Sequence, residues 1–237
     1  MYRRYGIIGG VLLVGVLLVG VLGFLGACAD QVSEQESSGV QVPVFEVNPL
    51  WPKPLPNHWV LGSTIGLSID SRDHVFVIHR ASTIDAANEL NVLHEPASAE
   101  CCAPAPPVLE FDPEGNVVGS WGGPGDGYDW PSSNHGITVD HMDNVWIGGN
   151  GPDDGHILKF TRDGNFLLQL GRPGVGTGSN DPENFGRVAE VSIDLGGDEV
   201  FVADGYLNRR VAVLDIRTGA LKRYWGAYGN RPDDAPV

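Results

Sequence analysis

Three stretches of the chain alternate apolar and polar residues around a short polar turn. The clearest covers 134–150, NHGITVDHMDNVWIGGN, in which apolar residues at every second position stop at a polar turn over 141–144 and then resume. Alternation with a period of two is typical of a strand with one buried face, and two such runs around a polar turn predict a β-hairpin. Related hairpins begin near Gly66 and Glu190. The chain therefore contains an internal repeat.

A second kind of hairpin follows each of the first three. An apolar run leads through one glycine to a bulky residue directly before a second glycine, and the spacing of the two glycines is the same in every copy. The glycine pairs are Gly115 with Gly122, Gly164 with Gly171, and Gly219 with Gly226. We expect the first glycine of each pair to adopt a positive φ in the hairpin turn, where a side chain would clash.

Four short strands per repeat are typical of a β-propeller blade. The sequence therefore predicts an all-β fold of the propeller class, with blades over about 65–121, 136–171 and 188–226 and no long helix after the N-terminus. Propellers close with about four to eight blades, and an open arc would expose a strand edge. We therefore expect the chain to be a C-terminally truncated fragment of a longer reading frame, whose full-length product is a monomer.

The N-terminus has the composition of a secretory signal. Two arginines precede an apolar run over 7–25 and small residues follow, so 1–27 is predicted to be a signal peptide. An uncleaved membrane anchor is the alternative, because about 20 apolar residues also span a bilayer. Residues 28–41 are polar and predict a flexible tether, which leaves 42–237 for the partial propeller. Both alternatives anchor the propeller at the membrane of the cell envelope, facing the periplasm or the exterior.

The three cysteines fall into two groups. Cys28 follows Leu-Gly-Ala, which resembles a bacterial lipobox, so we expect Cys28 to become the lipidated first residue of a lipoprotein. Cys101 and Cys102 are adjacent, inside a proline-rich insertion over 81–107 that we expect to be a loop. In an oxidising compartment these two could form a disulfide or remain thiols. A soft metal held with the nearby His94 is the other alternative.

The chain is strongly acidic. Its formal net charge is −15. Such a surface repels a phosphate backbone, so the charge excludes nucleic acid as a partner. Solubility explains the acidity without a specific ligand.

One motif carries a family resemblance. The residues 202–211, VADGYLNRRV, resemble the repeat of NHL-type propellers. More narrowly, the chain from about Leu61 to Gly226 is similar to peptidyl-α-hydroxyglycine α-amidating lyase and to its bacterial lipoprotein-like relatives. This resemblance implies a six-bladed ring, of which the chain holds about half. It also implies a zinc-dependent lyase that cleaves a C–N bond of a peptide or small-molecule substrate, giving a peptide amide and glyoxylate.

Three positions match functional residues of that family. Arg80 matches its substrate-orienting arginine, His135, directly before a glycine, matches a zinc ligand, and Tyr206 in Asp-Gly-Tyr matches its reactive tyrosine. In such a site zinc polarises the substrate hydroxyl, a tyrosinate takes the proton and an arginine fork holds a carboxylate or carbonyl. The family's other two zinc histidines belong to later blades, which this chain does not reach. A zinc centre takes roughly three or four ligands, so the implied ligand set is incomplete here.

Each of these residues also has a purely structural interpretation. His135 could bond a neighbouring blade, Arg80 could pair with a surplus acid, and Tyr206 could pack between blades. His79 and His156 are expected to be structural histidines with satisfied hydrogen bonds. The aspartates at the strand ends are expected to form turns rather than bind calcium; they are Asp70, Asp140 and Asp194.

Three functions remain open on the sequence. The first is a lyase of the amidating type, and the second is a non-catalytic propeller that binds proteins or glycans at the cell envelope. The third is a lactonase-like propeller with calcium at its hub, although the acidic cradle that calcium needs is not evident in the sequence.

Overall fold

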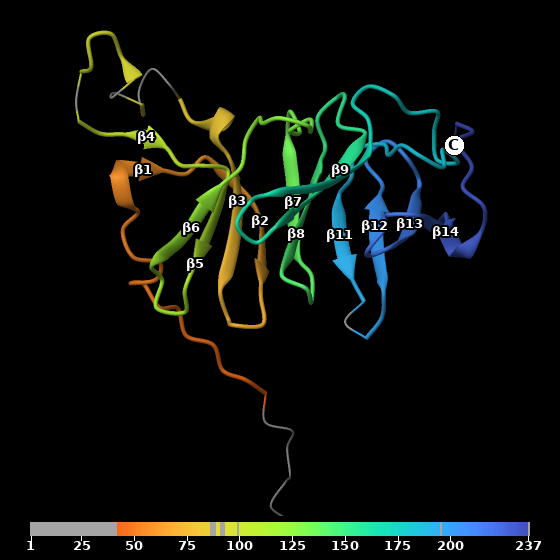
Figure 1. The fold of residues 1–237 in the computed structure, drawn as a ribbon, viewed down its shortest axis with the longest axis horizontal. Helices are drawn as coiled ribbons and strands as arrows, with labels where there is room; N and C mark the ends of the chain where they lie inside the picture. Colours follow the sequence, from red (N-terminus) through yellow and green to blue (C-terminus); the bar gives the residue numbers. More distant parts are fainter. Residues whose placement is uncertain (1–41, 86–88, 91–92, 99, 195, 237) are drawn as a thin grey trace, which may run out of the picture. The chain divides into compact units, whose positions relative to one another are not determined.

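The computed structural model describes residues 42–85, 89–90, 93–98, 100–194 and 196–236 (Figure 1). The expected signal peptide, Cys28 and almost all of the expected tether lie outside these residues. Asn48–Val237 forms one compact unit. Within the described ranges, no helix is long and apolar enough to cross a membrane.

Three four-stranded antiparallel sheets make up this unit, and in each the strands pair in chain order (Figure 1). The first sheet consists of β2 (Ser63–Ile69), β3 (Val75–Arg80), β5 (Val108–Phe111) and β6 (Val117–Trp121). The second consists of β7 (Asn134–Val139), β8 (Asn144–Gly149), β9 (His156–Thr161) and β10 (Phe166–Gly171). The third consists of β11 (Glu190–Ile193), β12 (Glu199–Asp204), β13 (Arg210–Asp215) and β14 (Leu221–Trp225). These are the three predicted blades.

The remaining elements are short. β1 (Trp59–Val60) pairs in parallel with β4 (Ala103–Pro104), which lies in the insertion between β3 and β5. Single 3-10 turns occur at Pro56–His58, Ala81–Thr83 and Ala227–Gly229. The described part of the chain contains no longer helix, in agreement with the all-β prediction.

Neighbouring sheets pack face to face, which makes each sheet a propeller blade. In β8, alternate side chains serve different cores. Val145 and Ile147 pack with Phe76 of the first sheet, whereas Trp146 packs with Val202 of the third. The side chains of all three β8 residues are fully buried. A strand covered on both faces has an apolar sequence, and the run after Asn144 follows this rule.

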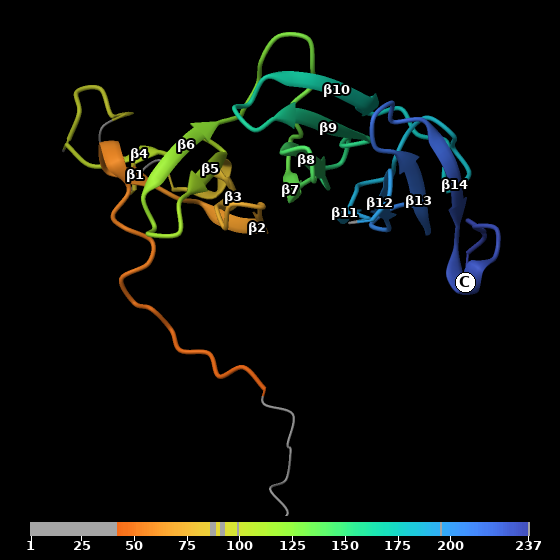
Figure 2. The same cartoon turned by 60° about the horizontal axis from the view of Figure 1, so that its bottom comes forward.

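The inner edges of the blades meet at their first strands. β7 contacts β2 and β3 on one side and β11 on the other. Figure 2 shows these strands at the ends of the three sheets that face one another. Consequently the first strand of each blade lies closest to its neighbours, and its end can present a side chain to residues of the next blade.

The turns follow the predicted chemistry. In each of the three equally spaced glycine pairs, the first glycine has a positive φ: 85° at Gly115, 81° at Gly164 and 73° at Gly219. Asp140 accepts hydrogen bonds from the backbone N–H groups of Met142 and Asn144, both at 2.9 Å. The expected turn role of the strand-end aspartates is therefore confirmed at this position.

Candidate functional site

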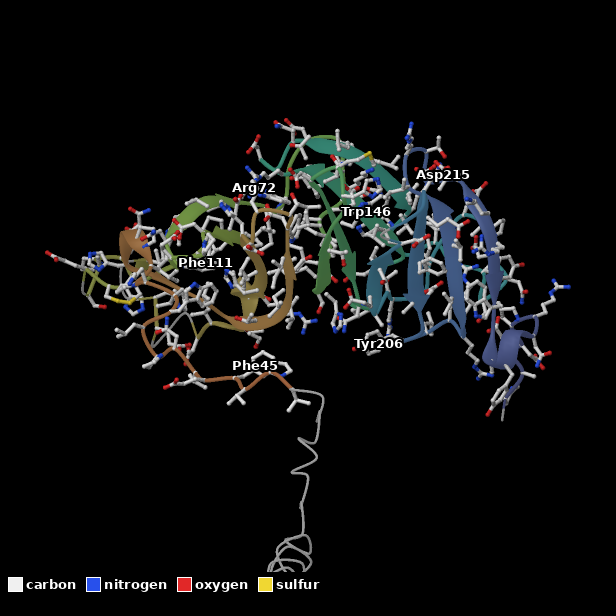
Figure 3. The ribbon with its side chains drawn as sticks, turned by 90° about the horizontal axis from the view of Figure 1, so that it is seen from below. Phe45, Arg72, Phe111, Trp146, Tyr206 and Asp215 are labelled. Atoms are coloured by element: carbon white, nitrogen blue, oxygen red, sulfur yellow. A yellow bond between two sulfur atoms is a disulfide. The ribbon has the colours of Figure 1, made fainter. Side chains whose placement is uncertain are left out.

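Arg80, His135 and Tyr206 come from three different blades but reach one rim. Arg80 is the last residue of β3, His135 is the second residue of β7, and Tyr206 follows the end of β12. Antiparallel pairing places the end of a second strand beside the start of the first, as in the pair Ser63 and Arg80. Figure 3 shows Tyr206 beside the strands of the third sheet.

A bulge in β7 sets the direction of the His135 side chain. The register between β7 and β8 shifts between His135 and Ile137, and the intervening Gly136 has a φ of 74°. Glycine adopts this left-handed conformation without the steric cost that a Cβ would bring. A bulge re-aims the side chains beside it, so the His-Gly dipeptide accounts for the orientation of the imidazole.

The imidazole of His135 makes two hydrogen bonds that fix its tautomer. Nδ1 lies 2.9 Å from the carbonyl oxygen of Ala189, and Nε2 lies 3.1 Å from the hydroxyl of Tyr206. Because a carbonyl only accepts, Nδ1 carries the proton and donates it to Ala189. Nε2 therefore holds a lone pair and accepts the hydrogen bond from Tyr206. A backbone carbonyl on the other ring nitrogen is also how proteins orient a metal-binding histidine.

Tyr206 meets His135 edge to face and remains accessible. The ring centroids are 5.4 Å apart with an interplanar angle of 76°. The side chain of Tyr206 is 54% exposed, so it does not pack between blades. A solvent-accessible phenol bonded to the lone pair of a neutral imidazole is a pair through which a proton can move between Oη and Nε2.

Arg80 is held next to His135 rather than against an acid. Its Nε donates to the carbonyl oxygen of Asn134 at 3.0 Å, and Nη2 donates to Oδ1 of Asn150 at 2.9 Å. Asn134 in turn donates from Nδ2 to the carbonyl oxygen of His79 at 3.1 Å. These bonds tie the first blade to the second, and they leave Nη1 of Arg80 without a protein partner among the described residues.

The Asp-Gly-Tyr sequence is held by a buried polar cage. The carboxylate of Asp204 accepts hydrogen bonds from the backbone N–H of Gly186, from Nδ2 of Asn208 and from Nε of Arg210. The guanidinium of Arg210 also donates to backbone carbonyls of the loop between β10 and β11, those of Ser179, Asp181 and Asn184. The cage fixes both ends of the loop that carries Tyr206.

Sequence reasoning assigned a role only to the tyrosine of this motif. Asp204, Asn208 and Arg210 lie within VADGYLNRRV and are all buried. The sequence signal for these three residues was that they are polar or charged and interrupt an otherwise apolar stretch. The partners of Arg80 had no such signal, because Asn134 and Asn150 are ordinary loop and strand-end residues in the sequence.

Two further histidines, His79 and His156, are buried within the fold. His79 is fully buried; its Nδ1 accepts from Gly62 N–H at 3.1 Å, and Nε2 donates to the carbonyl oxygens of Ala105 and Pro106. Burial lowers the pKa of His79, because the charged ring would lose hydration. His156 is buried too, and its Nε2 donates to the carbonyl oxygen of Asp129 at 2.7 Å, while Nδ1 has no partner among the described residues. The expectation of full satisfaction therefore holds for His79 and fails for His156.

The adjacent cysteines are joined. Cys101 and Cys102 form a disulfide in the insertion between β3 and β5. Their sulfurs are therefore not thiolates that could hold a soft metal. The Nδ1 atom of His94 lies 3.0 Å from the hydroxyl of Ser98.

The described side chains fit the zinc ion that the family resemblance implies only in part. The orientation of His135 fits one ligand, since Nε2 presents its lone pair and Nδ1 is fixed on a carbonyl. Among the described residues, however, no group of three or more His, Cys, Asp or Glu side chains could hold a metal ion. The described chain thus supplies one imidazole and not a complete metal centre.

Comparisons with known proteins agree with the repeat. No model of a known protein family matches the chain. It is 30% identical over 192 residues to peptidyl-alpha-hydroxyglycine alpha-amidating lyase 1 of Drosophila melanogaster, covering 74% of this chain and 31% of the lyase. It is 29% identical over 180 residues to NHL repeat-containing protein 3 of Mus musculus, covering 73% of this chain and 43% of that protein. The resemblance inferred from the motif is therefore confirmed, and the chain spans less than half the length of either relative.

A solved structure of a gluconolactonase from Xanthomonas campestris is also similar. It shares 14% sequence identity and a TM-score of 0.35, over 61% of this chain and 36% of that one.

Proposed function

We propose that this chain, a β-propeller of the NHL type, supplies part of the site of a lyase that cleaves the C–N bond of a peptidyl-α-hydroxyglycine or a related small α-hydroxy amide. Tyr206 and His135 would handle the proton, and Arg80 would orient the substrate. The activity comes from the likeness to the amidating lyase. The assignment of roles comes from the arrangement of the three side chains.

The observation that carries the proposal is the hydrogen bond from Tyr206 to Nε2 of His135, at 3.1 Å. Two residues from separate blades meet through their reactive atoms, at a rim that is open to solvent. A residue that only links blades would have no need of a second reactive partner. Arg80, bonded to the carbonyl of the residue before His135, brings a cation to the same place.

The proposed reaction balances with these groups alone. As the substrate hydroxyl loses its proton to Oη of Tyr206, the phenolic proton moves to Nε2 of His135. The carbinol carbon forms its C=O bond and the C–N bond breaks, which gives glyoxylate. The departing amide nitrogen takes one proton back through the same pair, so no oxidant or reductant is needed. Positioned proton transfer of this kind contributes about 10²–10⁴-fold to a rate.

The only zinc ligand that we propose in this chain is His135. With a zinc bound, Nε2 of His135 would be one of its ligands and could no longer accept the proton, so Tyr206 alone would act as the base; the other ligands are not among the described residues, and the zinc would make the substrate hydroxyl more acidic. Binding at Nε2 would displace the Tyr206 hydroxyl from the lone pair and leave it beside the metal. The described residues provide no comparable argument for calcium.

The test is glyoxylate release from α-hydroxyhippurate by the native protein. Tyr206→Phe keeps the ring and removes the hydroxyl, so it should lower the turnover number by about 10²-fold or more. Tyr228→Phe is the matched control, because Tyr228 is fully exposed and bonds nothing in the site. Equal activity of the two variants would exclude the proton role of Tyr206. No glyoxylate from the wild-type protein would exclude the lyase.

We further propose that the protein acts at the cell envelope, attached to the membrane through its N-terminus and facing the periplasm or exterior, as a monomer when full length. The support is the composition of residues 1–27 and the cysteine that follows them. Nucleic acid is not a proposed partner, because a formal net charge of −15 opposes it.

A second candidate is a non-catalytic propeller that binds a protein or glycan. The observation in its favour is that the described residues hold no complete metal centre. In that case Tyr206 and the adjacent Leu207, which is 64% exposed, would be contact residues of the rim. Wild-type binding of an envelope glycan with no glyoxylate release would favour this function over the lyase.

A further inference from the structure

A groove opens beside the loop that carries Tyr206. Its volume is about 490 Å³, and four segments line it: the loop after β8, the connection from β10 to β11, the loop after β12, and the C-terminal segment at Asp234. Pockets of roughly 300–1,000 Å³ hold small ligands. The groove therefore has the size of a binding site for a small molecule or the end of a peptide.

Arg187 connects this groove to the candidate site. Its backbone carbonyl accepts a hydrogen bond from the N–H of Tyr206 at 3.4 Å, and its side chain lines the groove. Two residues further along, the carbonyl of Ala189 holds Nδ1 of His135. The chain that positions the imidazole therefore also positions Arg187.

Arg187 is half-buried, and its Nε has no hydrogen-bond partner among the described residues. This Nε atom is buried, and no ion pair joins the guanidinium to any described residue. A buried N–H group without an acceptor is costly. What distinguishes Arg187 is this buried Nε without an acceptor, which indicates an acceptor that the described residues do not supply.

The other charged groups of the groove are mostly engaged. The carboxylate of Asp154 accepts from the N–H groups of Ser132, Ser133 and Gly151. That of Asp234 accepts from Ser179, which lowers the pKa of Asp234. Arg209 donates to the carbonyl oxygens of Asp233 and Ala235, at 3.0 and 2.8 Å. Asp153 is exposed, and no described side chain bonds its carboxylate.

Apolar side chains complete the walls. Phe185 is buried at the back of the groove, and Val175 and Leu207 are half or more exposed along it. A site with one unengaged guanidinium among apolar walls matches an amphipathic acid better than a free inorganic anion, because an inorganic anion cannot cover the apolar surface.

We propose that this groove binds a small amphipathic carboxylic acid, with the carboxylate on the guanidinium of Arg187 and the apolar part along Val175 and Leu207. That the acid is the substrate of the neighbouring Tyr206–His135 pair rests on the proposed lyase function; the binding itself does not. Arg80 donates two of its N–H groups to protein atoms, whereas the Arg187 side chain donates to none of the described residues, so Arg187 is the better carboxylate receptor of the two.

Hippurate is a suitable probe, because it carries a carboxylate and an apolar ring and cannot undergo the lyase reaction. Calorimetric titration of the purified 237-residue chain should show binding that weakens about tenfold or more in Arg187→Gln, since a charge-assisted bond to a carboxylate is lost. Arg187→Lys should recover part of the affinity. The matched control is Arg209→Gln, which removes an arginine of the same groove that is already engaged, and it should weaken binding no more than about threefold.

The methyl ester of hippurate tests the carboxylate directly and should bind about tenfold more weakly than hippurate. Equal affinity for ester and acid, or equal affinity of wild type and Arg187→Gln, would overturn the proposal. So would the absence of hippurate binding in a wild-type chain that melts cooperatively. Because hippurate is not turned over, Arg187-dependent binding without glyoxylate release from α-hydroxyhippurate would refute the lyase and keep the carboxylate site.

Discussion

The Nε of Arg210 lies 2.9 Å from the carboxylate of Asp204, in a salt bridge that is almost completely buried. The two residues are directly opposite in the pair of β12 and β13. Because Arg210 also binds three carbonyls of the connection from β10 to β11, one guanidinium joins the Tyr206 loop to the loop that lines the groove. The site and the groove therefore depend on a single buried cation.

Replacing this cation should destabilise the fold. Arg210→Ala leaves the carboxylate of Asp204 buried without its counter-charge, and the loss of one partner of a buried pair costs about 3–5 kcal/mol. Urea unfolding measures the free energy. The control is Arg223→Ala, since Arg223 makes an even closer pair with Glu199, at 2.6 Å, but is half exposed. That variant should lose much less stability than Arg210→Ala, because solvent screens an exposed pair. Similar losses in both would contradict the importance of burial.

His79 should make the stability depend on pH. Burial lowers its pKa below the ordinary 6.5, so the folded protein keeps the ring neutral where the unfolded chain already binds a proton. The unfolded state then binds more protons, and the free energy of unfolding falls as the pH drops below 6.5 towards the pKa of the folded state. The slope contributed by His79 is at most about 1.4 kcal/mol per pH unit.

His79→Gln should reduce this slope, because the amide does not titrate. Urea unfolding of wild type and variant at about pH 7.5 and about pH 5.5 spans the window in which the unfolded imidazole titrates. His141→Gln is the control, since His141 is an exposed turn residue. A wild-type free energy that falls no further on acidification than that of His79→Gln would disprove the assignment.

The blades could be predicted because their signal is local. Alternation within 134–150 and the glycine of each hairpin turn depend on neighbours in sequence, and the strands and the positive φ of Gly164 follow them. Trp146 and its neighbours lie in a strand that is covered on both faces, and the sequence shows this as an apolar run. The period of the apolar–polar alternation and the residues of the turns are therefore sufficient to predict the fold class.

The candidate site could be predicted only in part. The resemblance identified Tyr206 and His135, but their contact depends on the bulge at Gly136 and on Ala189 of the next blade. Arg187 had no sequence signal, since what distinguishes it is the lack of a partner in the folded chain. Such properties arise from loops brought together by tertiary packing, which a local pattern does not encode.

Cys28 should carry a lipid. It follows Leu-Gly-Ala after an apolar run, so Cys28→Ala should abolish labelling with a clickable palmitate analogue and leave the leader attached. Cys101→Ala is the matched control and should be labelled as wild type is, because Cys101 is in the disulfide of the folded unit. Equal labelling of wild type and Cys28→Ala would contradict the lipoprotein, and a cleaved but unlabelled protein would indicate an ordinary signal peptide.

Zinc should bind the 237-residue chain only weakly. Nε2 of His135 is the one atom of the site that is oriented as a ligand, and no set of three ligating side chains exists among the described residues. Zinc must also displace the hydroxyl of Tyr206. A tight site requires roughly three or four ligands, so calorimetric titration with zinc should show no stoichiometric binding below about micromolar Kd. Tyr206→Phe should tighten the weak binding slightly, because it removes the competing donor. A nanomolar one-to-one site that disappears in His135→Ala would show that residues of this chain complete the coordination.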